Sequence, residues 1–193
     1  ASFDLRRSAI ADAKADALRL AAVTGQNQAR VIEDSRGLLT ALASLSEIRN
    51  RDEAECRHVL GEMLRGNRSY LNFGVTDTAG IVVCSVLPMR GPVNAADRSW
   101  FRRAWSTRSF AVGDYQIGRI TGKPSIDVAQ PIRSSDGRFT GVMVAAIDLG
   151  AFTDLAADLN LPAGASLHVI DGTGVVLARY PDGEKWIGKS LPE

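Results

Sequence analysis

The first 50 residues carry the hydrophobic and polar pattern of a long helix. No proline interrupts residues 3–50, and small or apolar side chains recur at intervals of three or four residues. A helix of this length would extend roughly 60–70 Å, which is far longer than the helices of most compact domains. The pattern predicts a stalk beside a domain; two ordinary helices packed on a core are the alternative. The stripe comprises Leu18, Ala22, Gly25, Ala29, Ile32, Leu39 and Ala43.

Residues 51–65 predict a second helix. Asp52 is suited to cap its N-terminus, and the sequence Gly66-Asn67-Arg68-Ser69 ends it. Its predicted apolar face consists of Val59, Leu60, Met63 and Leu64.

From residue 70 the pattern changes to short β-like segments separated by turn residues. One segment in this region is different, because Asn94 can cap a helix that runs to about Ser106. The pattern therefore predicts an α+β fold in which the long N-terminal helix precedes a PAS-like, five-stranded antiparallel sheet with one inserted helix. The five predicted strands are residues 70–77, 81–87, 110–121, 125–132 and 141–149.

Residues 166–178 repeat the pattern of residues 73–85. Both segments read as a strand, an Asp-x-x-Gly turn and another strand. The repeat predicts the first hairpin of a second PAS-like module. An isolated hairpin is marginal in water, so this one should pack against the stalk through Val169, Val175 and Leu177.

These patterns divide the chain into three parts. Residues 1–50 form the stalk, residues 51–160 the ligand-binding module, and residues 161–193 the beginning of the second module. A short helix over residues 151–159 is expected to join the two modules. We expect the parent protein to continue beyond residue 193, because the second sheet is not completed.

Composition argues against several classes of partner and site. The net charge of +1 offers no electrostatic basis for a nucleic-acid partner. Cys56 and Cys84 match neither a disulfide framework nor a zinc site, so each is expected to be a buried small apolar group. With two histidines in the chain, neither a metal cluster nor a cofactor is expected. No run approaches the ~20 apolar residues of a membrane span.

The chemistry concentrates in the segment Asp97–Trp105. It contains two of the three tryptophans and three arginines, which suits a pocket that stacks on a small molecule and binds its anionic end. The alternative is an amphipathic helix with aromatics in the core and arginines in water. No nucleophile elbow, phosphate loop or metal cluster accompanies the segment, so a binding role is favoured over catalysis.

Several motifs resemble the double Cache sensor family. They are Asp97-Arg98-Ser99-Trp100-Phe101, Gly113-Asp114-Tyr115-Gln116-Ile117-Gly118, Ala145-Ala146-Ile147-Asp148-Leu149, and Ile170-Asp171-Gly172 followed by Trp186-Ile187-Gly188-Lys189. The resemblance implies an extracytoplasmic ligand-binding domain of a bacterial histidine kinase, diguanylate cyclase or chemoreceptor.

The resemblance also implies site residues. In amino-acid-binding members, an arginine and a tryptophan two positions apart hold the ligand carboxylate, and Arg98 and Trp100 match them. Asp148 matches an aspartate that holds the ammonium group. Phe101 stands where a tyrosine is expected, and Tyr115 falls near another tyrosine position. Asp127 on the neighbouring strand is a further candidate.

Val93 likewise stands where the family pattern has an upstream tyrosine, and these departures at Phe101 and Val93 make a small carboxylate or another polar metabolite as suitable a ligand as an amino acid. A structural dimerisation module with a degenerate pocket is the alternative function, followed by a small-molecule enzyme. The resemblance further implies a homodimer in the intact receptor, transmembrane helices outside residues 1–193, and a periplasmic domain on an inner-membrane protein.

Overall fold

The computed structural model describes residues 2–50, 52–150, 153, 161 and 164–191, with side chains described from residue 14 onward. The predicted helix over residues 151–159 lies outside the described residues, apart from Thr153. The division of the chain into three domains stays a prediction.

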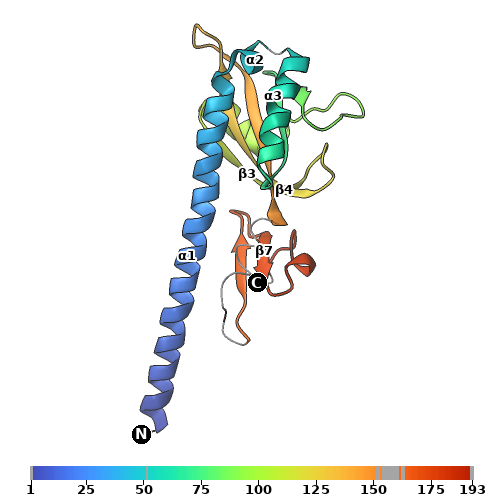
Figure 1. The fold of residues 1–193 in the computed structure, drawn as a ribbon. Helices are drawn as coiled ribbons and strands as arrows, with labels where there is room; N and C mark the ends of the chain where they lie inside the picture. The colour runs from blue at the N-terminus through green and yellow to red at the C-terminus, as the bar shows by residue number, and fades with distance from the viewer. Residues whose placement is uncertain (1, 51, 151–152, 154–160, 162–163, 192–193) are drawn as a thin grey trace.

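One continuous helix, α1 (Ser2–Ser44), forms the stalk, followed by the single turn α2 (Ser46–Arg49). Of the two arrangements predicted for this segment, the long stalk is the one observed. Figure 1 shows α1 running along one side of the molecule, with its C-terminal part against the sheet and its N-terminal part extending away. Leu39, Leu42 and Ala43 are buried against the sheet, whereas Leu18 near the other end is exposed.

The short helix α3 (Glu53–Gly66) follows as predicted. The Asp52 carboxylate caps it by accepting hydrogen bonds from the backbone N–H groups of Ala54 and Glu55, at 3.0 and 3.1 Å. Leu60 is fully buried on its inner face.

The predicted antiparallel sheet is confirmed, with strand order β2-β1-β5-β4-β3. α1 and α3 cover one face, where Leu39, Leu60 and Phe73 belong to one hydrophobic cluster. Helix α4 (Ser99–Thr107) covers part of the other face, with Trp100 and Phe101 buried against it. The strands are β1 (Tyr70–Thr76), β2 (Val82–Ser85), β3 (Ala111–Ile117), β4 (Pro124–Arg133) and β5 (Phe139–Asp148).

The expectation for the two cysteines was wrong in its chemistry. Cys56 and Cys84 are buried, as expected, but they form a disulfide that joins α3 to β2. They are 28 residues apart and belong to elements of different type. Their proximity therefore depends on how α3 packs on the sheet, which the sequence spacing does not reveal.

The inserted helix begins later than predicted, at Ser99 instead of at Asn94. The Asn94 side chain accepts a hydrogen bond from the backbone N–H of Ala96 at 2.7 Å, and Asn94 forms an isolated β-bridge with Ile81. This bridge holds Asn94 itself in an extended conformation, and a turn at Ala96 and Asp97 follows before the helix. Asn94 therefore stabilises a turn in residues 94–98, the lead-in to α4, and does not cap the N-terminus of the helix.

The C-terminal hairpin comprises β6 (Leu167–Ile170) and β7 (Val176–Tyr180), followed by the 3₁₀ turn η1 (Gly183–Lys185). It lies beside α1 in Figure 1. Val169 and Leu177 are buried in the cluster shared with α1, as predicted. Val175 is only half-buried, and Val176 takes the fully buried position instead.

Tyr115 joins this hairpin to the five-stranded sheet. Its backbone N–H donates to Asp171 Oδ2 at 3.0 Å, and its phenol ring lies so close to Gly188 that a side chain there would collide with it. Asp171 Oδ1 meanwhile accepts from the backbone N–H groups of Thr173 and Val175. Asp171 Oδ1 therefore stabilises the turn of the hairpin, and Oδ2 connects the hairpin to the five-stranded sheet.

Replacing Asp171 by asparagine should loosen this junction without breaking the turn. The amide oxygen can keep the turn contacts, but an amide nitrogen facing the Tyr115 N–H is a second donor. A lost buried acceptor is worth about 1–2 kcal/mol, so amide exchange in residues 167–180 should accelerate roughly 5- to 30-fold.

The matched control is Asp77→Asn. Asp77 forms the equivalent turn of the first hairpin, and both of its hydrogen bonds go to Oδ1. Its substitution should leave exchange in the C-terminal hairpin unchanged. Equal exchange rates for the two variants would show that the Tyr115–Asp171 contact does not stabilise the hairpin.

Candidate functional site

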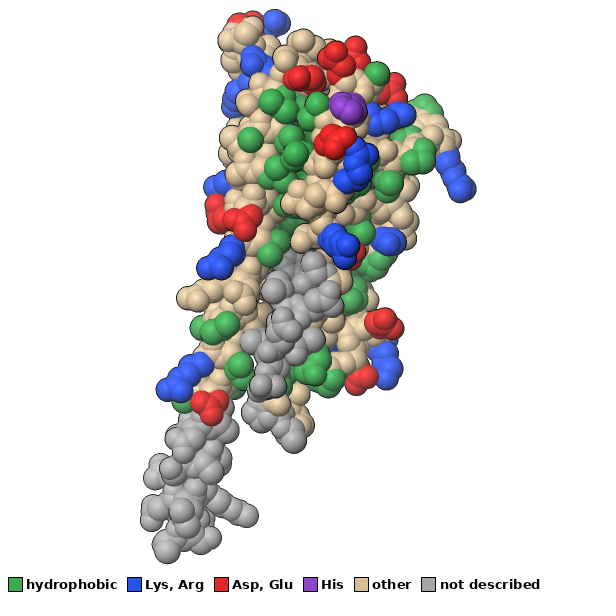
Figure 2. All heavy atoms as spheres, in the orientation of Figure 1, with side chains coloured by type: hydrophobic (Ala, Val, Ile, Leu, Met, Phe, Trp, Pro, Cys, Tyr) green, Lys and Arg blue, Asp and Glu red, His purple; other side chains and the backbone are tan. Residues whose placement is uncertain are grey.

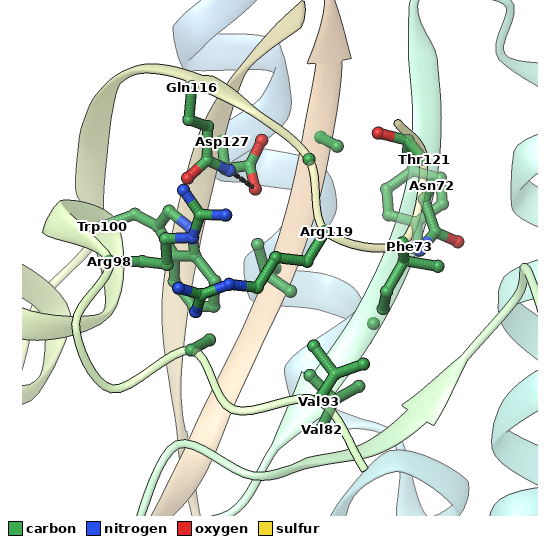
Figure 3. A pocket seen from close by; sticks show the side chains of 16 residues that line it. Asn72, Phe73, Val82, Val93, Arg98, Trp100, Gln116, Arg119, Thr121 and Asp127 are labelled. Atoms are coloured by element: carbon green, nitrogen blue, oxygen red, sulfur yellow. Dashed lines mark hydrogen bonds between the residues drawn. The ribbon is translucent and has the colours of Figure 1, made fainter. Parts of the chain in front are cut away.

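The lead-in to α4 directs two predicted site residues into the same cavity. Arg98 occupies the N-cap position with an extended backbone (φ −72°, ψ 139°) and makes no side-chain capping hydrogen bond. Because the backbone of Arg98 is extended, its side chain does not take the direction that it would have in a helix. Trp100 lies in the first turn of α4. A regular helix would separate the two side chains by about 200°. Both line one cavity between the sheet and the lead-in (Figure 3).

The cavity is small and has a polar end and an apolar end. Its volume is about 60 Å³. Figure 3 shows Arg98, Trp100, Gln116 and Asp127 gathered at one end, whereas Val82 and Val93 lie at the other. Val144 and Ala146 of β5 complete the apolar lining. This arrangement suits a ligand with one polar group and a short apolar part.

Asp127 is the buried acid of the cavity, with 7% of its surface exposed. Its Oδ1 accepts from Ser125 Oγ at 2.7 Å, and its Oδ2 accepts from Gln116 Nε2. Burial raises the pKa of Asp127 to about 6, although both hydrogen bonds and the nearby Arg98 guanidinium favour the ionised form. The raised pKa shows that the surrounding groups compensate only part of the desolvation of the carboxylate.

Arg98 and Trp100 place hydrogen-bond donors in the same cavity as Asp127. Arg98 Nη2 donates to the Ile117 carbonyl at 3.2 Å, and partial burial lowers the pKa of the guanidinium. Trp100 Nε1 is buried and has no acceptor among the described residues. A buried donor without a partner carries a free-energy penalty of about 1–3 kcal/mol, which an acceptor on a ligand would remove.

Arg119 also lines the cavity, but its charge is already paired. It forms a two-pronged ion pair with Asp97, with both N–O distances at 2.7 Å. A hydrogen bond from Arg119 holds the pKa of Asp97 down at about 2. The pair connects the β3–β4 loop to the lead-in and so fixes two segments that line the cavity.

Three of the six predicted site residues come together and three lie elsewhere. Arg98, Trp100 and Asp127 line the cavity, and Phe101, Tyr115 and Asp148 are outside its lining. Phe101 is buried between α4 and the sheet. Asp148 follows Ala146 on the same face of β5, at the end of the strand, where its carboxylate accepts from the Gly150 N–H at 2.9 Å.

A β-bulge explains why Gln116 lies in the cavity and Tyr115 does not. Val112 pairs with Val128 and Tyr115 pairs with Ile126, so β3 has one extra residue between these pairs. Beyond the bulge, Tyr115 lies on the face covered by α1, and Gln116 lies opposite Ser125 on the cavity face. One inserted residue moves every following side chain to the other face of a strand.

The Gly113-Asp114 motif positions α4. A Cβ at Gly113 would lie only 3.0 Å from Trp100 Cβ, so glycine permits the close packing of α4 on β3. Asp114 accepts two hydrogen bonds from Arg103 Nη2, at 2.7 and 3.0 Å, and its N–H donates to Ser99 Oγ at 2.9 Å. The motif thus holds the helix that carries Trp100, without itself lining the cavity.

Sequence reasoning missed Gln116, Arg119 and Asn72 as cavity residues. Asn72 braces the apolar end, because its Nδ2 donates to Ser85 Oγ at 3.0 Å and its Oδ1 accepts from the Leu87 N–H at 3.1 Å. Asn72 stands in a strand otherwise rich in apolar and aromatic residues, and this was an available signal. For Gln116 and Arg119, no comparable signal precedes knowledge of the bulge and the loop.

The raised pKa of Asp127 makes a pH prediction. An aspartate in an unfolded chain titrates near 3.9, so the folded state binds this proton more tightly than the unfolded state. The contribution of the neutral acid to stability is complete below about pH 4 and is lost as pH rises through 6. The side chain of Asp127→Asn cannot titrate. Between pH 4 and pH 7.5, the free energy of unfolding of this variant should therefore rise by about 2 kcal/mol relative to that of the parent.

Urea denaturation of both proteins at several pH values measures this difference. A constant difference in unfolding free energy from pH 4 to pH 7.5 would show that Asp127 keeps an ordinary pKa in the fold.

Two wider features of the described residues bear on the site. They contain no group of three or more His, Cys, Asp or Glu side chains placed to hold a metal ion. Among the described helices, none has both the length and the apolar character of a membrane span.

Solved structures with this fold include the extracellular domain assigned to histidine kinase rpHK1S-Z16, with a TM-score of 0.75 and 18% identity over 86% of this chain and 68% of that one. The ligand-binding domain of the Pseudomonas fluorescens chemoreceptor CtaA, in complex with L-serine, gives a TM-score of 0.69 and 21% identity over 88% of this chain and 72% of that one.

A sequence relative is sporulation kinase D of Bacillus subtilis, which is 26% identical over 125 residues, or 65% of this chain. The matched region spans about a quarter of the kinase, 24% of its length. The Cache domain family matches residues 5–193, which is nearly the whole sequence. This chain therefore belongs to the Cache domain family of sensor domains.

Proposed function

We propose that this chain is the extracytoplasmic ligand-binding domain of a membrane-anchored receptor of the histidine kinase or diguanylate cyclase type. Its ligand is a small carboxylate held in the cavity of the five-stranded sheet. The observation that carries this proposal is the pair of donors from Arg98 and Trp100 in one small cavity, where Trp100 Nε1 has no described acceptor. A carboxylate oxygen is the acceptor that such donors bind most strongly.

The disulfide supports the extracytoplasmic location. Disulfides persist in oxidising compartments and are rare in the cytosol, and the Cys56–Cys84 bond lies in the core of the fold. The two solved structures with this fold are an extracellular domain and a chemoreceptor ligand-binding domain.

The proposed receptor is a homodimer with transmembrane helices outside this sequence. Three small residues of α1, Ala22, Gly25 and Ala29, are exposed and would allow a second helix to approach closely. Figure 2 shows acidic and basic side chains intermixed over the visible described surface, including the part of α1 that extends beyond the sheet.

A thermal-shift screen against small carboxylates, amino acids, amines and sugars tests the proposed function. A ligand at 100 times its Kd should stabilise the domain by about 2.7 kcal/mol, which raises the Tm by roughly 5–10 °C. A module with a degenerate pocket would not be stabilised by any compound. An enzyme would convert the stabilising compound, which chromatography of the incubated mixture would reveal.

A further inference from the structure

We infer that the ligand of this cavity is a short aliphatic monocarboxylate and that it binds together with one proton, which Asp127 holds. This inference rests on the proposed function and goes further by naming the ligand class and its dependence on pH.

The charges around the cavity favour a ligand with one negative charge. Two guanidinium groups line it, but Arg119 already forms a two-pronged ion pair with Asp97. Among the described residues, Arg98 has no carboxylate within ion-pair distance, and its side chain donates its hydrogen bond to a neutral carbonyl, that of Ile117. Arg98 can therefore neutralise one carboxylate, and the lining described here contains no second unpaired cation for a dicarboxylate.

The opposite end of the cavity suits a short hydrocarbon chain. Val82 and Val93 line it, and Val144 adds to the apolar lining of the cavity. A volume of about 60 Å³ is far below the roughly 300–1,000 Å³ of pockets for drug-sized ligands. Such a space accepts only a small ligand, of the size of propionate or butyrate.

Asp127 is the group that takes the proton. The titratable groups that face the cavity with it are Arg98 from the α4 lead-in and Arg119, paired with Asp97, from the β3–β4 loop. β3 contributes the neutral Gln116, and β1 and β5 contribute no charged lining residue.

A carboxylate bound to Arg98 would be a second anion beside a buried acid. Two carboxyl groups that share one cation do not both stay ionised, because each raises the pKa of the other. Burial already raises the pKa of Asp127 to about 6, and a second anion would raise it further. Protonated Asp127 would then have an O–H that can donate to the ligand.

An α-amino acid would have the reverse effect. Its ammonium group would stabilise the ionised form of Asp127, so binding would not take up a proton. The ammonium partners of the amino-acid pattern are also displaced here. Phe101 has no hydroxyl, and both Phe101 and Asp148 lie outside the cavity lining.

Isothermal titration calorimetry of the whole chain separates these two ligand classes. The probes are propionate and butyrate, compared with alanine and 2-aminobutyrate, which have the same carbon chains plus an amino group. Propionate stays ionised between pH 6 and pH 8. Its Kd should nevertheless rise about 10- to 50-fold over this range, because Asp127 must be protonated for binding.

Asp127→Asn has a neutral side chain that can still donate a hydrogen bond. Its Kd for propionate should change less than about twofold between pH 6 and pH 8. Proton uptake by the parent protein, measured from the binding enthalpy in buffers of different ionisation enthalpy, should be close to one proton at pH 7.5. This second measurement does not depend on the folding of the variant.

The outcomes distinguish the inference from the proposed function. If alanine binds and propionate does not, or if propionate binds without proton uptake, the inference is overturned and the sensor function stands. If no compound of any class stabilises or binds the chain, the proposed function fails, and the inference fails with it.

Discussion

Replacing both Cys56 and Cys84 by alanine should lower the free energy of unfolding by about 3–4 kcal/mol. The disulfide closes a segment with a sequence separation of 28, and a loop of this length has a chain-entropy contribution of that size. The bond also fixes α3 against β2, the edge strand whose Val82 lines the cavity. Urea denaturation under oxidising conditions measures the loss.

The control for this prediction is reduction of the parent protein. A reducing agent should shift the unfolding midpoint of the parent toward that of the double variant, and it should leave the variant unchanged. Alanine is preferable to serine because both sites are fully buried, and a serine hydroxyl there would lack a hydrogen-bond partner. A double variant as stable as the oxidised parent would show that the packing of α3 is sufficient without the bond.

The arrangement of the elements was predictable because each has a local signal. The stalk follows from a proline-free stretch with three- and four-residue spacing, and the sheet follows from β-like segments separated by turns. The Asp52 cap was correctly predicted because it depends only on residues two and three positions away. The start of α4 was wrong because Asn94 is held by a bridge to Ile81, a contact outside its own segment.

The candidate site was partly predictable for the same reason. Arg98 and Trp100 are two positions apart, so one irregular turn is enough to bring both into the cavity. The face of the sheet on which Tyr115 lies depends on the bulge in β3. Its pairing with Ile126 is a contact between two strands, which the local sequence does not reveal. The disulfide likewise required the packing of α3 on the sheet. Neither feature leaves a periodic pattern in the sequence.

The largest predicted effect on binding belongs to Arg98. Replacing it by alanine should weaken the binding of propionate by about 2–5 kcal/mol, or roughly 30- to several-thousand-fold, because the ligand carboxylate loses its charged partner in a partly desolvated site. The fold should persist, since the hydrogen bond that the Arg98 side chain makes to described residues, at 3.2 Å, goes to the exposed end of β3.

Arg102→Ala is the matched control for this substitution. Arg102 lies four residues further along the chain, on α4, and its side chain is exposed and outside the cavity lining. It should bind propionate as the parent does, which excludes a general effect of removing a positive charge. Trp100→Phe removes the indole N–H together with one ring of the buried indole, and it should weaken binding about tenfold or more, because a hydrogen bond to a charged group is lost along with packing contacts. Calorimetry on the three variants therefore separates charge from hydrogen bonding, and a parent-like affinity in Arg98→Ala would place the ligand outside this cavity.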